Sequence, residues 1–498
     1  MKTQVRQLAT GCAVLLSTVY AMASATDPNW DIAGLVDSGK RLATAAVTEN
    51  TRCMDLVDAD TLLFIHGRQS RNVVVYELQT RGDLGTAQFL YAFDTTPYFG
   101  TRAQTESVGH GIFVKRETLD RMWLWNRTEL WAFDMPEPGD VRSARFSGYR
   151  SFAGEVTRGH AIHFRPDGRA FYVEDRDQAR VHQFSMATPW DIETIVPDGQ
   201  LDISARHAAV RGLEFNPDGT VMYLLDTELR EVQQYGLGQA WNVTSAVFEK
   251  AFALGMENPR GMTWNRHGSR LYIMDATTRE ATQFNVAGAV DPLQLRYEPG
   301  PGGGFMGETE QWLPPGGEGA PVEAVPETGA RFYRWSDGRM DNPRTDTEIA
   351  VDTVVRAYFE SDGGVPIDWY QEHGFFPGEG ASWAHLDMED PTAKGMPLRS
   401  QFIAALDPND PVSRFSITSL AIGPAIMIRV QPVRATRRYT VEVSADPSAP
   451  DGWDSVPGLV DVIPGPGDTA LTLEAPALPE ETGVFFRVGV RVSSPEEP

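Results

Sequence analysis

Cysteine is almost absent from this chain of 498 residues, whose only two thiols are Cys12 and Cys53. Exported domains that lack a large hydrophobic core usually rely on several disulfides. Two cysteines allow one disulfide at most, and Cys12 lies in a segment that we expect to be removed. The composition therefore excludes a disulfide scaffold, and the fold must be held together by packing.

Basic residues are also scarce, since 44 Lys and Arg stand against 68 Asp and Glu, giving a formal net charge of −24. Nucleic-acid binding depends on basic surface that neutralises phosphates. The charge balance therefore excludes nucleic acid as a partner, and it suits a soluble protein that works outside a cell.

Long apolar runs are missing beyond the first 25 residues, so no membrane span is expected. Within those residues, Lys2 and Arg6 precede the short apolar run "ATGCAVLLSTVYAM", and the small residues "ASA" follow it. This order is typical of a secretory signal peptide. We predict that residues 1–25 are removed and that the protein is secreted, periplasmic or displayed at the cell surface.

A repeat of roughly fifty residues dominates the sequence that follows. Its clearest copy is "RGLEFNPDGTVMYLLD" (residues 211–226), in which two apolar strands flank a tight turn. Three copies keep the same spacing of an aromatic residue, a tyrosine and an aspartate: Phe164, Tyr172 and Asp175; Phe215, Tyr223 and Asp226; Trp264, Tyr272 and Asp275. Two fainter copies begin near residues 51 and 109. Five such units of four strands predict a five-bladed β-propeller over residues 26–292.

The start of the mature chain resembles the segments that close the repeats. "PNWDI" at residues 28–32 matches "TPWDI" at 188–192 and "QAWNV" at 239–243. We therefore predict that the N-terminal segment supplies the outer strand of the last blade and closes the ring. Packing between blades explains the recurring Trp190 and Trp241 better than sugar stacking does.

These repeats resemble those of secreted and cell-surface bacterial propellers of the "RGLxFxPDGxxxYxxD" type. The resemblance implies the fold alone, because such propellers include binding modules, lactonases and proteins of unknown role. Lactonases of this type hold an axial cation with Glu, Asn and Asp. The corresponding positions here are Arg and His, which disfavours that chemistry.

The C-terminal half changes composition after Leu293. The motifs "GARFYRWSDG", "DNPRTDT" and "VVRAYF" make residues 293–361 similar to an internalin-type B-repeat module, a small β-fold that implies spacing or adhesion. Residues 362–415 resemble the helical connector of bacterial exoproteins. The alternating strands of residues 416–498 resemble a fibronectin-like β-sandwich.

Connectors of this kind carry a calcium loop, and here its residues have changed. Asp390 and Gly395 remain, whereas Thr392, Lys394 and Gln401 stand where carboxylates are needed. An ammonium group opposes a divalent cation, so we expect no calcium here. No cofactor is expected elsewhere in the chain.

Candidate ligand-binding residues lie at one end of the predicted propeller axis. The first strands of the five units begin with Arg52, His110, His160, Arg211 and Arg260. Second strands end at the same face, with Asp175, Asp226 and Asp275 in the clear copies. One interpretation is a site for an anionic or polyhydroxylated ligand such as an acidic glycan. The other is an Arg–Asp network that joins blades, because like charges ~8 Å apart repel by roughly 2 kcal/mol and need counter-ions.

Catalytic and metal-binding motifs are lacking in the sequence. His110, His160 and His163 could meet, but no HxH, HExxH or acidic cluster accompanies them, so no metal site is predicted. No GxSxG occurs, and Cys53 is expected to be a buried packing residue.

The predicted function is therefore a non-catalytic binding or adhesion protein whose propeller recognises an extracellular glycan or protein ligand. One alternative is a polysaccharide hydrolase or lyase with His110 or His160 as acid–base, which a carboxylate pair near the axis would favour. Another is a structural surface protein in which every axial arginine is paired. A shallow ring site with exposed aromatics would favour binding.

Overall fold

The computed structural model describes residues 29–99, 109–423, 425–449, 451–476 and 484–493. The predicted signal peptide, residues 1–25, lies outside these ranges. The chain divides into two compact units, Met1–Asp291 and Pro292–Pro498, which are treated separately below. Within the described ranges, no helix is long and apolar enough to cross a membrane.

The described residues of the first unit form five sheets of four antiparallel strands. The first two sheets comprise β2 (Thr51–Val57), β3 (Leu62–Gly67), β4 (Asn72–Leu78) and β5 (Ala87–Asp94), then β6 (Gly111–Val114), β7 (Arg121–Asn126), β8 (Glu129–Asp134) and β9 (Arg145–Ser151). The next two comprise β10 (Gly159–Phe164), β11 (Ala170–Asp175), β12 (Arg180–Met186) and β13 (Ile195–Asp202), then β14 (Val210–Phe215), β15 (Val221–Asp226), β16 (Glu231–Leu237) and β17 (Ala246–Ala253). The last comprises β18 (Pro259–Trp264), β19 (Arg270–Asp275), β20 (Glu280–Val286) and β1 (Leu35–Ala43).

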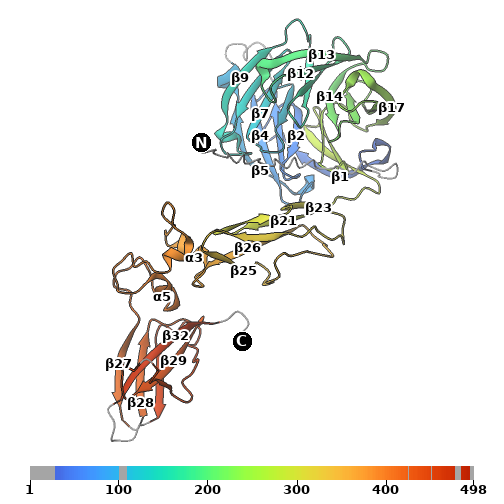
Figure 1. Cartoon of the computed structure of the whole chain (residues 1–498). Helices are drawn as coiled ribbons and strands as arrows, with labels where there is room; N and C mark the ends of the chain where they lie inside the picture. The colour runs from blue at the N-terminus through green and yellow to red at the C-terminus, as the bar shows by residue number, and fades with distance from the viewer. Residues whose placement is uncertain (1–28, 100–108, 424, 450, 477–483, 494–498) are drawn as a thin grey trace, which may run out of the picture. The chain divides into compact units, whose positions relative to one another are not determined.

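The innermost strands β2, β6, β10, β14 and β18 contact one another in that order, and β18 contacts β2 again. The sheets therefore surround a common axis as a closed ring, which is the architecture of a β-propeller (Figure 1). The predicted mainly β fold, with a propeller in its N-terminal part, is confirmed by this topology.

The ring closes through the N-terminal segment, as predicted. Strand β1 pairs antiparallel with β20, with Leu35 opposite Val286. It is preceded by the 3-10 helix η1 (Ile32–Gly34), whose start is capped by Asp31 accepting a hydrogen bond from the Ala33 amide at 2.8 Å. The same short helix precedes the other outer strands: η2 (Leu84–Thr86), η3 (Val141–Ser143), η4 (Ile192–Thr194) and η5 (Val243–Ser245).

The repeated aromatic residues fasten neighbouring sheets together. The hydroxyl of Tyr172 donates to the carbonyl of Trp241 at 2.6 Å, and Tyr223 donates in the same way to Trp30. Trp190 stacks on Trp123 with ring centroids 5.3 Å apart. The interpretation of these tryptophans as packing residues is confirmed.

The second unit begins with a mixed sheet in the order β23-β21-β26-β25, in which β21 and β26 are parallel. Trp335 is fully buried in its core, and the Arg344 guanidinium lies 5.0 Å from the centre of the indole ring. The strands are β21 (Leu293–Pro299), β22 (Gly303–Met306), β23 (Glu310–Leu313), β24 (Glu323–Pro326), β25 (Ala330–Trp335) and β26 (Thr353–Ser361). The short helices are α3 (Ile367–Glu372), α4 (Trp383–Leu386) and α5 (Leu398–Ile403), with α1 (Thr96–Phe99) in the first unit.

The chain's last strands form two three-stranded sheets, β27-β28-β31 and β30-β29-β32. Ile428, Tyr439 and Leu473, which come from both sheets, share one core, so the sheets make a β-sandwich. The bounds are β27 (Ser416–Ile422), β28 (Ala425–Gln431), β29 (Arg437–Ser444), β30 (Asp454–Ser455), β31 (Leu471–Pro476) and β32 (Phe485–Val492). The resemblances to internalin-type and fibronectin-like modules stay predictions.

A lysine ammonium occupies the altered calcium loop. Lys394 Nζ donates to Gln401 Oε1 at 3.0 Å and to the Asp407 carbonyl. Asp390 accepts hydrogen bonds from the amides of Lys394 and Gly395. The side chain of Lys394 thus supplies a positive charge inside the loop.

Candidate functional site: the arginine mouth of the propeller

The structure brings the residues that begin the five inner strands together at one end of the axis. The rings of His110 and His160 stack with centroids 4.7 Å apart, and Arg211 Nη1 lies 3.3 Å from His160 Nε2. Gly261 follows Arg260 in β18. A Cβ built on Gly261 would lie 2.6 Å from the carbonyl oxygen of Arg52 in β2, so the starts of β18 and β2 also adjoin. We call this end, defined by Arg52, His110, His160, Arg211 and Arg260, the arginine mouth.

The arginines of this mouth repel one another. Burial, together with the charges of Arg68, Arg260 and Arg211, lowers the pKa of Arg52 to about 9. Burial and the neighbouring charge of Arg260 likewise lower the pKa of Arg211 to about 9. Since a lowered arginine pKa means that the charged form is destabilised, the mouth holds more positive charge than its surroundings compensate.

The histidines of the mouth are neutral. Arg211 can only donate, so His160 Nε2 must accept, and the proton of this imidazole lies on Nδ1, which is 3.5 Å from Glu174 Oε1. Burial, then the neighbouring His110 and Arg211, hold the pKa of His160 far below its usual value. Burial and the charge of Arg52 do the same for the pKa of His110. The positive charge of the mouth therefore comes from its arginines.

The three aspartates do not pair with these arginines, so the predicted Arg–Asp network is wrong. Asp226 Oδ2 accepts from the amides of Ala208 and Ala209, at 2.8 and 3.0 Å, and Oδ1 accepts from two further amides. Asp175 and Asp275 bind backbone amides in the same pattern. Within the described ranges, none of the three forms an ion pair with Arg52, Arg211 or Arg260. Their carboxylates tie the loop before each inner strand to the turn after the second strand, and sequence spacing could not reveal that use.

Two further arginines extend the mouth over the first two sheets, and sequence reasoning missed them. Arg68 directly follows β3, and its Cα would lie 3.2 Å from a Cβ at Gly109, next to His110. Arg127 follows β7, and its carbonyl accepts from the Gly159 amide at 2.8 Å, next to His160. Both stand one residue beyond the second strand, a repeat position that could have identified them.

Several guanidinium donors of the mouth are buried without a partner. Arg260 Nε and Nη1, Arg211 Nε, Arg68 Nε and Arg127 Nε make no hydrogen bond to any described residue. Arg52 Nε donates to Asn50 Oδ1 at 3.1 Å. Leaving a buried polar group unpaired costs about 1–3 kcal/mol, more for a charged one. An anion with several acceptor oxygens would satisfy these donors.

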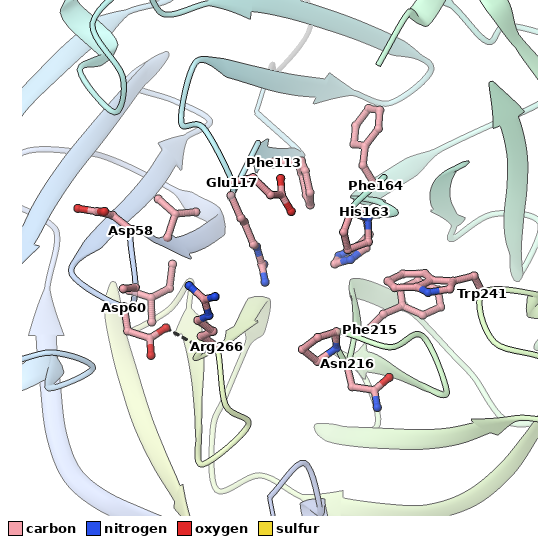
Figure 2. Close-up of a pocket in the computed structure, with 16 residues that line it drawn as sticks. Asp58, Asp60, Phe113, Glu117, His163, Phe164, Phe215, Asn216, Trp241 and Arg266 are labelled. Atoms are coloured by element: carbon pink, nitrogen blue, oxygen red, sulfur yellow. Dashed lines mark hydrogen bonds between the residues drawn. The ribbon is translucent and has the colours of Figure 1, made fainter. Parts of the chain in front are cut away.

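The opposite end of the axis contains a pocket of about 210 Å³ that the sequence reasoning did not predict (Figure 2). At its base, Arg116 Nη2 lies 2.9 Å from Asp55 Oδ1 and 3.7 Å from Glu214 Oε2. His163 Nδ1 lies 3.3 Å from the same Glu214 oxygen. His163 therefore belongs to this end and not to the His110–His160 pair.

Behind the pocket lining, Asp55 and Glu214 form the carboxylate pair near the axis that would favour an enzyme, but both contact Arg116. Burial, which outweighs the contact with Arg116, raises the pKa of Asp55 to about 6. Asp55, His163 and Glu214 each stand one residue before the last anchor of an inner strand. A polar residue just before the last apolar anchor of an inner strand could have indicated this pocket from the sequence alone.

No metal cluster is found among the residues that the structure describes, in the sense of three or more His, Cys, Asp or Glu side chains brought together. Cys53 is buried and free, as expected.

No protein-family model matches the sequence, and no curated protein is significantly similar to it. Among solved structures, the β-propeller domain of Cps50 (Swd1) from Myceliophteria thermophila is similar over 48% of this chain and 83% of that chain, with 11% identity and a TM-score of 0.31. A candidate 6-phosphogluconolactonase from Bacteroides uniformis is similar over 59% of this chain and 70% of that chain, with 11% identity and a TM-score of 0.30. These similarities are too low to support an argument about function.

Proposed function

We propose that this is a non-catalytic binding protein, exported from the cell, whose propeller recognises an anionic extracellular ligand at the arginine mouth. The observation that supports it most is the set of buried guanidinium donors, on Arg68, Arg127, Arg211 and Arg260, that have no partner within the described ranges. A structural role alone would favour paired arginines, because unpaired buried charges destabilise a fold.

The ligand class follows from the contrast between the mouth and the whole chain. The formal net charge is −24, so a ligand that is anionic along its entire length is repelled by most of the surface. A carboxylate or sulfate group presented on a largely neutral carrier reaches the axis at lower cost. An acidic glycan, whose hydroxyl groups can also accept hydrogen bonds, has this chemistry.

The histidines support binding over acid–base catalysis. A general acid works best with a pKa near the operating pH. Burial and neighbouring positive charge hold the pKa of both His110 and His160 far below that range. Near neutral pH neither ring is in the protonated imidazolium form that a general acid needs.

A glycan array followed by calorimetric titration tests the proposal. We expect acidic glycans to bind the wild type and to bind Arg211→Ala/Arg260→Ala at least about tenfold more weakly, since each lost charge-assisted hydrogen bond contributes roughly 1.5–3 kcal/mol. The control is Arg145→Ala/Arg169→Ala, which removes two exposed arginines elsewhere on the propeller. Circular dichroism and a melting curve verify folding.

Three results would contradict the proposal: equal binding by the mouth variant and the control, no binding of any acidic glycan, or cleavage of the bound glycan. Cleavage would support the hydrolase or lyase alternative instead.

A further inference from the structure

The arginine mouth holds more positive charge than a single negative charge compensates. Within the described ranges, five arginines at this end form no ion pair: Arg52, Arg68, Arg127, Arg211 and Arg260. They lie in, or directly after, strands of four different sheets, so they approach the axis from several sides. A monoanion would offset one of these charges and leave the others repelling one another.

Two neighbouring arginines are paired, and they do not relieve this repulsion. Arg158 Nη1 lies 3.3 Å from Asp177 Oδ1, and Arg176 Nη2 lies 3.3 Å from Glu228 Oε1. Burial, then the charges of Arg260 and Arg176, lower the pKa of Arg211 to about 9. The ion pairs of Arg158 and Arg176 therefore leave the centre of the mouth positive.

The other carboxyl groups at this end bind backbone groups instead of arginines. Asp175, Asp226 and Asp275 accept hydrogen bonds from amides. Glu174 is fully buried and accepts from the Ala161 amide at 3.2 Å. Burial raises the pKa of Glu174 well above its usual value, so the neutral form of this group is favoured. Further compensation of the five arginines is therefore left to a ligand.

The unpaired donors favour an anionic group with three terminal oxygens over one with two. Among the described residues, five buried N–H groups of the mouth lack a partner: Nε of Arg68, Arg127 and Arg211, and both Nε and Nη1 of Arg260. A carboxylate offers about four acceptor positions on two oxygens in one plane. A tetrahedral phosphate or sulfate group presents three terminal oxygens and can accept from more directions. It can therefore reach donors that come from different sheets.

We propose that the anionic group recognised at the arginine mouth is a phosphate monoester. This inference rests on the function proposed above, and it selects one group among those that an acidic glycan can carry. Near pH 7 a phosphate monoester has a charge of about −1.5 to −2 on three terminal oxygens, because its second pKa is about 6. A sulfate ester has the same three oxygens but a single charge, and a carboxylate has a single charge on two oxygens. The phosphate group thus compensates more of the five arginines than either alternative.

Methyl phosphate and methyl sulfate test the inference, because they share their size, shape and three terminal oxygens but differ by about one charge at pH 7.5. Calorimetric titration in a low-salt buffer should show that methyl phosphate binds the wild type at least about tenfold more tightly than methyl sulfate. Acetate, which has one charge and two oxygens, should bind no more tightly than methyl sulfate.

Arg68→Gln/Arg127→Gln removes two of the five unpaired charges and leaves the residues that begin the inner strands unchanged. The ratio of methyl phosphate affinity to methyl sulfate affinity should fall at least about threefold, because a second negative charge gains less in a weaker positive field. The matched control, Arg145→Gln/Arg169→Gln, replaces two exposed arginines elsewhere on the propeller and should keep the wild-type ratio. A melting curve verifies that both variants fold.

The inference is overturned if methyl sulfate binds as tightly as methyl phosphate, if Arg68→Gln/Arg127→Gln keeps the wild-type ratio, or if methyl phosphate does not bind the wild type at millimolar concentration. In each case, the function proposed above still stands where acidic glycans bind the wild type and lose affinity for Arg211→Ala/Arg260→Ala. Absence of binding by the two methyl esters and by every acidic glycan would contradict both proposals.

Discussion

Replacing Arg211 by methionine should stabilise the ligand-free propeller while removing its affinity for anions. Methionine keeps the length of the side chain but carries no charge and no donors. The difference between the usual pKa of 12.5 and the value of about 9 corresponds to about 5 kcal/mol of unfavourable interaction of the charged form. The substitution also loses the hydrogen bond to His160, worth about 1 kcal/mol, and solvent screening reduces the electrostatic gain. A net stabilisation of about 2 kcal/mol is expected.

Calorimetry of the full chain measures this effect, because the propeller and the C-terminal unit can unfold separately. For a unit of this size, about 2 kcal/mol raises the melting temperature by roughly 4–8 °C. Sodium sulfate supplies an anion for the mouth, so it should raise the melting temperature of the wild type more than that of Arg211→Met. Arg145→Met, on an exposed outer strand, is the control and should change neither value.

The reasoning is refuted if Arg211→Met lowers the melting temperature of the propeller, or if sulfate stabilises the variant and the wild type equally. The first result would mean that Arg211 has partners that satisfy its charge. The second would mean that the mouth holds no anion.

Three further predictions concern the scaffold. Gly219→Ala should destabilise the propeller by more than about 3 kcal/mol, because the new Cβ would lie 2.3 Å from the indole ring of Trp241. Gly39 has a similar φ of +76° but no atom near its Cβ position, so Gly39→Ala should cost only about 1 kcal/mol. Urea unfolding measures both changes in stability. Burial alone would raise the pKa of Asp226, but its hydrogen bonds together outweigh burial and lower the pKa to about 2. The carboxylate should therefore stabilise the fold by about 1–2 kcal/mol above pH 4, and this stabilisation should be lost as the pH falls towards 2. Asp226→Asn should remove that part of the acid unfolding transition. Lys394→Asp/Gln401→Glu should melt at a higher temperature in calcium than in EDTA, a difference that the wild type should lack.

Much of the propeller could be predicted from the sequence because its repeats constrain neighbouring residues. A tyrosine eight residues after an aromatic anchor marks two paired strands, and the segment around Trp30 matches later closing segments closely enough to reveal its pairing with the last sheet. The clustering of Arg52, Arg211 and Arg260 followed from the same register, since equivalent positions of a closed ring must meet at its axis.

Neither the use of the aspartates nor the pocket at the opposite end of the axis could be predicted in this way. Spacing shows that Asp226 lies near the mouth, but whether it binds arginine or backbone amides depends on the turn geometry a few residues away. The pocket combines side chains from several repeats that differ from one another at the same position. Asp55 and Glu214 become partners only through Arg116, which lies outside any strand.

The two ends of the axis illustrate how a ring of repeats treats charge. At the strand starts, the repeats carry similar residues, Arg or His, so the fivefold arrangement gathers like charges that cannot compensate one another. At the strand ends, the position before the anchor is occupied by Asp55, Phe113, His163, Glu214 and Thr263, and this variety allows pairing around Arg116. A propeller that retains uncompensated arginines at one mouth loses stability there. The loss is offset when an anion binds, which is why the arginine mouth is the better candidate for the principal ligand site.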